Sequence, residues 1–157
     1  MSADTAAPAP ASTPAPTKSG GSKAVSIIGI LVIVAGAILT IAGGVTWSTV
    51  QSELKAQKIT VSQDAASFAG QAVNGPFTAY AEAEVINEHA MKASGGKTYA
   101  ELSKDDPKRE TVMTASFLRA SLFTSVVAFG VAAMAMGLGV IFVLIGVALM
   151  RVAKVRS

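Results

Sequence analysis

The side chains best suited to acid–base or metal chemistry gather around His89, the only histidine of the chain. Glu82, Glu84 and Glu88 precede it closely. On a helix Glu82 and His89 share a face but stand two turns apart, too far for one metal ion to bridge. The Glu-x-x-His and His-Glu-x-x-His patterns of di-iron and zinc sites are both missing. We therefore assign no catalytic, metal or cofactor-binding residue, and interpret the stretch as a solvated acidic face with a Glu88–Lys92 ion pair.

Other kinds of site are also excluded by composition. The chain has no cysteine, so it forms no disulfide and no thiolate site. No glycine-rich loop follows a strand to bind phosphate, and no Ser/His/Asp set can be proposed. The net charge of +3 is spread along the chain instead of forming a basic patch, so nucleic acid is not an expected partner.

The elements that must position these residues are dominated by two apolar segments, Ala24–Trp47 and Ala120–Met150. Each exceeds the ~20 residues with which a helix crosses the hydrocarbon core of a bilayer. Neither contains an ionisable residue, which disfavours transport by this chain alone. The first segment is longer than the apolar core of a signal peptide, so we expect an uncleaved anchor. The fold class predicted is an all-α membrane protein with two transmembrane helices, which makes membrane lipid an expected partner.

Charge predicts the orientation of these helices. Basic residues precede the first apolar segment and follow the second, whereas residues 48–116 between the segments hold seven Lys and Arg against nine Asp and Glu. Because positively charged flanks stay cytoplasmic, both termini are expected on the cytoplasmic side of the plasma membrane. Lys55 and Lys58 weigh against this orientation. The predicted organisation is a disordered Ala/Pro-rich tail (1–22), a first span (24–47), a mostly helical extracytoplasmic cap (48–119), a second span with an outer extension (120–150) and a basic end (151–157).

Within the cap, glycine and proline mark the ends of helices. A helix is predicted over 77–92, ended by Gly95-Gly96, and a capping-box pattern predicts a short helix at Thr98–Glu101. Asp106-Pro107 predicts the start of a helix that continues to at least Arg151. Lys58–Ser62 reads as a brief strand. The apolar side of the first of these helices is expected to carry Phe77, Tyr80, Ala81, Val85 and Ala90.

The second span is about ten residues too long for the bilayer. With Arg151 at the inner interface, the outer interface falls near Phe129. Leu118, Leu122 and Phe123 are then expected above the bilayer, packed against the helix over 77–92.

Small residues recur along both spans. Gly36, Thr40 and Gly44 have a four-residue spacing, and Gly130, Ala133 and Gly137 give the second span a similar face. Pairs seven residues apart, Gly29 with Gly36 and Gly139 with Gly146, are also present. Small side chains let helix backbones approach closely, so we expect the spans to pack on each other and to leave one face for a partner. Trp47 fits an interfacial anchor.

Three stretches resemble a family of small two-pass actinobacterial membrane proteins: NGPFTAYAEAEVINEH (Asn74–His89), GGKTYAEL (Gly95–Leu102) and ASFLRASLFTSVVAFGVAAM (Ala115–Met134). The resemblance covers roughly Ala24–Arg151. Members often carry the label "aromatic ring-opening dioxygenase" of the LigA type. Extradiol ring-opening enzymes hold non-haem iron with two His and one carboxylate, and this chain has one histidine. The resemblance therefore implies fold and topology, and no catalytic residue.

Three functional hypotheses follow. The first is a non-enzymatic accessory or scaffold subunit of a larger membrane assembly, with other membrane subunits or a second copy as partners. The second is the iron enzyme that the family label names. The third is a sensor with an external cap and a cytoplasmic tail.

Overall fold

The computed structural model describes residues 20–155, which form three helices. They are α1 (Gly20–Ala56), α2 (Pro76–Ser94) and α3 (Lys108–Val155). The described part of the chain has no strand, and the strand-like stretch at Lys58–Ser62 contributes only an isolated antiparallel bridge between Thr60 and Ala72. Most of the predicted disordered tail lies outside the described residues, although its end from Gly20 onward belongs to α1.

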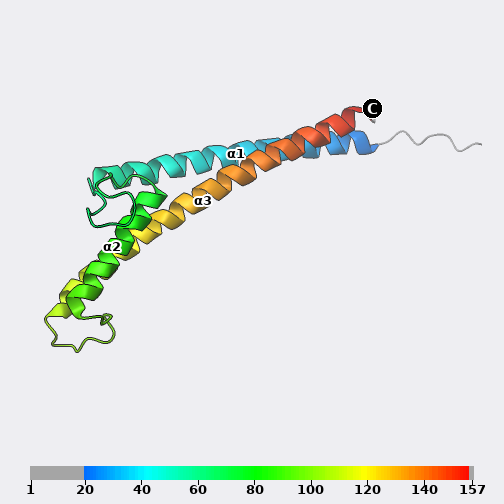
Figure 1. Ribbon diagram of the computed structural model, residues 1–157. Coiled ribbons are helices and arrows are strands. Elements are labelled where there is room, and N and C mark those ends of the chain that lie inside the picture. Colours follow the sequence, from blue (N-terminus) through cyan, green and yellow to red (C-terminus); the bar gives the residue numbers. More distant parts are fainter. Residues whose placement is uncertain (1–19, 156–157) are drawn as a thin grey trace, which may run out of the picture.

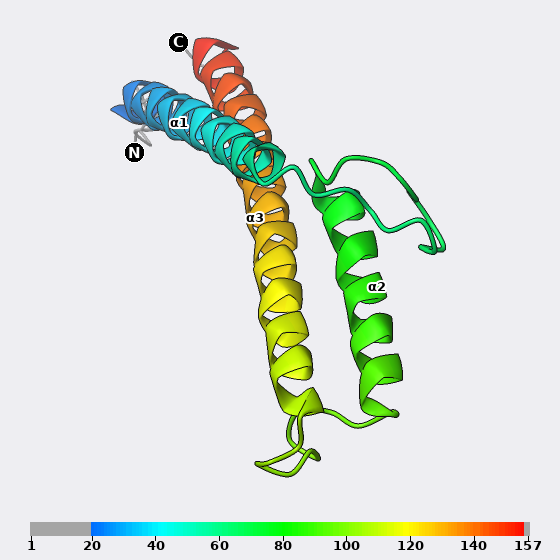
Figure 2. The same cartoon turned by 90° about the vertical axis from the view of Figure 1, so that its left-hand side faces the viewer.

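The long helices α1 and α3 run antiparallel, and α3 extends well beyond α1 (Figure 1). The second view shows α2 lying along this extension, antiparallel to it, so that α3 contacts α1 with one half and α2 with the other (Figure 2). The start of α1 and the end of α3 lie at the same end of the molecule (Figure 1). Both helices are long and apolar enough to cross a membrane.

The ends of α2 are fixed by local hydrogen bonds. Pro76 occupies the first turn, where its missing N–H leaves no bond unmade. Thr78 Oγ1 accepts from the backbone N–H groups of Asn74 and Gly75, each at 3.2 Å. At the other end Gly95 has a φ of 74°, a left-handed conformation that favours glycine, and ends the helix as predicted.

The start of α3 also follows the prediction, since the Lys108 N–H donates to Asp106 Oδ1 at 2.9 Å. The short helix predicted at Thr98–Glu101 is wrong. The expected capping bond forms, with the Thr98 N–H 2.8 Å from Glu101 Oε2, but only a turn follows. Helix nucleation is costly, and too few residues remain before Pro107 to extend the turn.

A core cluster of buried apolar side chains lies where the three helices meet. We call the segment between α1 and α2, residues 57–75, the first connection. The cluster contains Leu54 of α1, Val61 and Val73 of the first connection, Ala79 and Ala83 of α2, and Leu122 and Phe129 of α3. The first connection is held across it by backbone bonds, including Val73 N–H to Ile59 O at 2.9 Å. The core of the molecule therefore includes the loop as well as the helices.

The contact between α2 and α3 corrects two predictions. The expected apolar face of α2 is confirmed for Val85 and Ala90, which are buried, but wrong for Phe77, which is 73% exposed; Ala79 and Ala83 are fully buried instead. Close approach of the helices is made through alanines, and the larger aromatic side chains lie at its margin. Leu122 is buried against α2 as predicted, but Leu118, one turn earlier, is 50% exposed and lines an open hollow beside Ile86 and Ala90 of α2.

Candidate functional site

The closest helix contact in the described chain is a glycine seam between α1 and α3. It comprises Gly29, Gly36 and Gly43 of α1 and Ala132, Gly139 and Gly146 of α3. A Cβ placed on Gly36 would lie 2.5 Å from the Gly139 carbonyl oxygen, and one placed on Gly43 would lie 2.7 Å from the Ala132 oxygen. These positions therefore admit no side chain without moving a backbone.

The seam repeats every seven residues on both helices. Gly29 meets Gly146, Gly36 meets Gly139 and Gly43 meets Ala132, so each step up α1 is matched by an equal step down α3. Seven residues is the spacing that keeps one face of a helix toward a partner along its length. The register of the two helices is consequently defined at three successive points.

The structure brings together only part of the predicted packing set. Gly36 is buried in the seam, and Thr40 contacts Gly139 while its hydroxyl donates to the Gly36 oxygen at 2.9 Å. Gly44, Gly130 and Gly137 have nothing within 4 Å of their Cβ positions, and Ala133 is exposed. Within this chain these positions do not lie between α1 and α3, so their packing against another helix stays a prediction. The four-residue spacing drifts around the helix, whereas the seven-residue spacing of Gly29/Gly36 and Gly139/Gly146 stays on the contact face.

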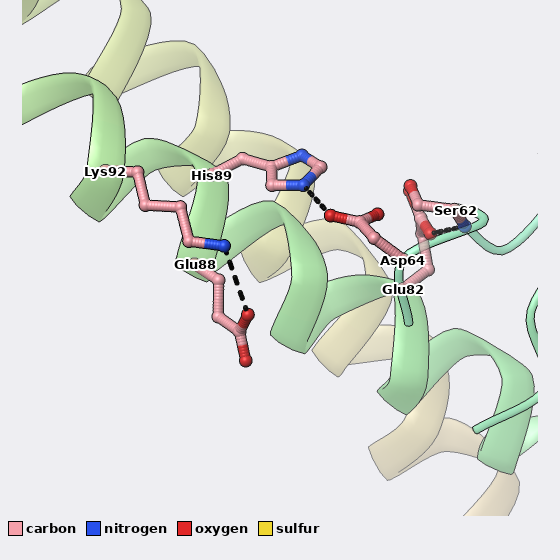
Figure 3. Close-up of polar contacts among 6 residues, drawn as sticks. All are labelled: Ser62, Asp64, Glu82, Glu88, His89 and Lys92. Atoms are coloured by element: carbon pink, nitrogen blue, oxygen red, sulfur yellow. Dashed lines mark hydrogen bonds and ion pairs between the residues drawn. The ribbon is translucent and has the colours of Figure 1, made fainter. Parts of the chain in front are cut away.

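A second group of interactions attaches the first connection to α2 (Figure 3). Glu82 is buried, and its Oε2 accepts from the Ser62 N–H at 2.8 Å while its Oε1 accepts from the Ser62 hydroxyl at 3.2 Å. A buried carboxylate needs such donors because an unpaired buried charge is strongly disfavoured. Sequence reasoning missed this role, although Glu82 lies three residues after Ala79 and beside Ala83, on the alanine face.

His89 contacts the same connection, two helical turns further along α2. Its Nε2 lies 2.6 Å from Asp64 Oδ2, and both side chains are about half exposed (Figure 3). The hydrogen bond from His89 lowers the pKa of Asp64 below its ordinary value of 3.8, with a smaller contribution from the charge of Lys92. The predicted ion pair between Glu88 and Lys92 is present at 3.8 Å, on the exposed side of the helix.

On the opposite side of α2, a partly open space of about 270 Å³ lies between α2 and α3. Arg119 of α3 lines this space, and we call it the Arg119 cavity. The guanidinium lies 3.7 Å from a Glu84 oxygen and 5.1 Å from the centre of the Phe123 ring. Its Nε is inaccessible and has no hydrogen-bond partner among the described residues. Such a group costs roughly 1–3 kcal/mol when nothing accepts from it.

The loop at the end of this cavity is organised by Arg109. Its guanidinium stacks 3.9 Å from the centre of the Tyr99 ring and donates to the Leu102 carbonyl oxygen at 2.7 Å. In the same loop, the Thr98 backbone N–H and hydroxyl lower the pKa of Glu101. Tyr99 and Thr98 thereby form one wall of the Arg119 cavity.

These contacts separate the side chains that the sequence placed together. Glu82 is turned to Ser62, Glu84 to Arg119 and His89 to Asp64. Among residues 20–155, no group of three or more His, Cys, Asp or Glu side chains could hold a metal ion. The arrangement instead attaches loops to α2 through carboxylates.

A scan of protein-family models, a search of curated proteins and a search of solved structures each find no match to this chain. The resemblance to small actinobacterial membrane proteins stays a prediction.

Proposed function

We propose that the chain is a two-pass membrane protein in which α1 and α3 cross the bilayer and α2 lies outside it. The observation that carries this proposal is the belt of exposed apolar side chains around the α1–α3 pair. In the most apolar windows of α1 and α3 only 11% and 17% of residues are buried. Isoleucine, leucine and valine cover the remaining surface on both helices, far more than a water-exposed surface normally carries.

The limits of the belt support the same placement. At one end Trp47 and Phe129 meet edge to face with their ring centres 4.7 Å apart, and the core cluster begins there. At the other end Lys23 of α1 and Arg151 of α3 flank the belt. Aromatic rings at one boundary and basic residues at the other are typical of a span with both termini in the cytoplasm.

Hydroxyl groups within the belt are satisfied by their own helix. Thr46 donates to the Ala42 oxygen at 2.9 Å, and Thr40 donates to the Gly36 oxygen at the same distance. Hydrogen bonds of this kind let polar side chains lie in hydrocarbon, where an unpaired group is costly. These helices therefore need no further polar partner at either position.

Within the membrane, we propose that the protein acts as a non-enzymatic accessory or scaffold subunit. Gly44, Gly130 and Gly137 support this role because a Cβ placed on each would have nothing within 4 Å. Each position therefore leaves room for the close approach of another helix. The partner would be a membrane helix of another subunit or of a second copy.

Two experiments test the proposal. Cysteine introduced at the exposed Ser67 should react with a membrane-impermeant reagent in intact cells, and cysteine at Ser12 should react only after lysis. The opposite labelling pattern contradicts the topology.

Pull-down in mild detergent should recover membrane subunits in fixed ratio, and Gly137→Leu should reduce that recovery. Recovery of the chain alone, as a monomer, contradicts the accessory role.

A sensor is the second candidate, and the Arg119 cavity favours it. A ligand bound between α2 and α3 would stabilise one arrangement of the two helices over another.

The iron enzyme named by the family label would need metal ligands from another chain, because this chain supplies one histidine. Stoichiometric iron that survives purification and is lost in His89→Ala would favour that enzyme over both other candidates.

A further inference from the structure

We propose that the Arg119 cavity binds a small ligand that carries an oxyanion, a phosphate monoester or a carboxylate, on a short hydrocarbon body. The first reason is the guanidinium of Arg119, whose side chain lines the cavity and is 40% exposed. A guanidinium presents its N–H groups in a planar fork that fits two oxygens of one anion. Besides the Phe123 ring at 5.1 Å, the described residues provide the guanidinium only with Glu84, at 3.7 Å and with both side chains partly exposed. Such a pair is weak and can be displaced.

The second reason is the division of the cavity into a polar and an apolar part. Asn87 lines the same space as Arg119, and its side-chain amide carries N–H groups that can donate to an anion. Met91, Val112 and Phe123 line the same space and offer only apolar contact. A bare inorganic anion would satisfy the first part and leave the second unused, whereas a ligand with a hydrocarbon body uses both.

The size and position of the cavity restrict the ligand further. A volume of about 270 Å³ is at the lower end of ligand pockets, which restricts the body to a few carbon atoms. Arg119 precedes Phe129 by ten residues, or about 15 Å along the helix. If Phe129 marks the outer boundary of the bilayer, as the proposed function holds, the ligand enters from water. This is the one respect in which the inference depends on that function.

The test uses the full chain in an uncharged detergent and follows nitrogen-15 signals of the arginine Nε–H groups and the asparagine side-chain amides. The chain has four arginines and two asparagines, so substitution assigns each signal. Butyl phosphate is the first probe. We expect a saturable shift of the Arg119 and Asn87 signals, while the Arg151 signal does not move.

Three comparisons sharpen the result. Inorganic phosphate should bind about tenfold more weakly than butyl phosphate, as expected if two methylene groups are buried. Arg119→Gln should weaken butyl phosphate binding, read from the Asn87 signal, by about tenfold or more, and Arg151→Gln should leave it unchanged. Ser116→Leu, which fills the cavity and keeps the arginine, should weaken butyl phosphate alone.

The source of the anion is resolved in the same titration. Stronger competition by a short-chain phosphatidic acid assigns the site to a lipid headgroup, and weaker competition assigns it to a soluble ligand. The proposal is overturned if the Arg119 signal moves linearly without saturation, or if chloride produces the same shift, because the cavity then holds water and adventitious ions only. Neither result depends on topology in the membrane, so failure here is distinguishable from failure of the proposed function.

Discussion

Helix α3 makes two contacts of different construction, one with α1 and one with α2. The glycine seam brings backbones together through atoms that have no side chain between them. The contact with α2 is made through buried alanines and is completed by loops, by the Glu82–Ser62 hydrogen bonds and by the Arg119–Glu84 pair. One helix therefore has a dry contact along one half and a mixed polar and apolar contact along the other.

Under the proposed placement in a bilayer, this difference corresponds to two solvents. In hydrocarbon, burying an apolar side chain gains nothing, and helices associate through close packing, as at the seam. In water, burial of apolar surface is the main driving force, as in the core cluster around Leu122. The change from one construction to the other occurs near Phe129, which supports placing the bilayer boundary there.

The largest effect is expected at the seam. Gly36→Leu should separate α1 from α3 altogether, a larger loss than one cavity would cause, because four side-chain carbons would overlap the backbone of α3; a few extra methylene groups in a packed contact already cost about 1–3 kcal/mol. Thermal unfolding in detergent measures the loss. Gly44→Leu is the matched control on the same helix and should retain stability. Equal destabilisation by both substitutions would remove the distinction between the seam and the open face.

Next in size is the core cluster. Leu122→Ala should destabilise the α2 contact by about 2–5 kcal/mol, since a buried leucine leaves a cavity. Hydrogen exchange of α2 amides reports the change. Leu118→Ala, on an exposed side chain one turn away, should have little effect. A comparable response of α2 to both variants would show that this contact does not depend on the core cluster.

A smaller loss is expected at the buried carboxylate. Glu82→Gln should destabilise the first connection by about 1 kcal/mol, because a neutral amide makes weaker hydrogen bonds with the N–H and hydroxyl of Ser62 than a carboxylate does. Proteolysis within residues 62–72 measures the opening of the loop. Glu88→Gln, on the exposed side of α2, should be cleaved at the rate of the unmodified chain.

The smallest effect concerns pH. The pKa of Asp64 is lowered in the folded chain by its hydrogen bond from His89, so the contact contributes stability above pH 3.8 and loses it as the pH falls through the folded pKa. His89→Ala should raise the pKa of Asp64 toward 3.8, followed by the carbon-13 shift of its carboxyl group. An unchanged pKa in the variant would show that backbone groups, and not the imidazole, stabilise the carboxylate.

Much of the fold follows from local signals in the sequence. Gly75-Pro76, Gly95-Gly96 and Asp106-Pro107 fix the helix ends because each acts on its own backbone. The seam could be predicted only in part from the sequence. Four-residue and seven-residue spacings of glycine coexist in the helices, and only the packing of the partner helix selects between them. The contacts of Glu82, His89 and Arg119 join residues distant in sequence, so periodicity along one helix cannot reveal them.

The paired repeat of the seam also limits how the protein can move. With Gly36 against Gly139, a slide of α1 past α3 by one or a few residues would bring side chains onto the opposing backbone. The next sterically equivalent alignment is seven residues away, a displacement of about 10 Å. A piston-like stroke of one helix along the other is therefore blocked, and any motion transmitted from α2 to the far end must be a tilt or rotation of the pair as a unit.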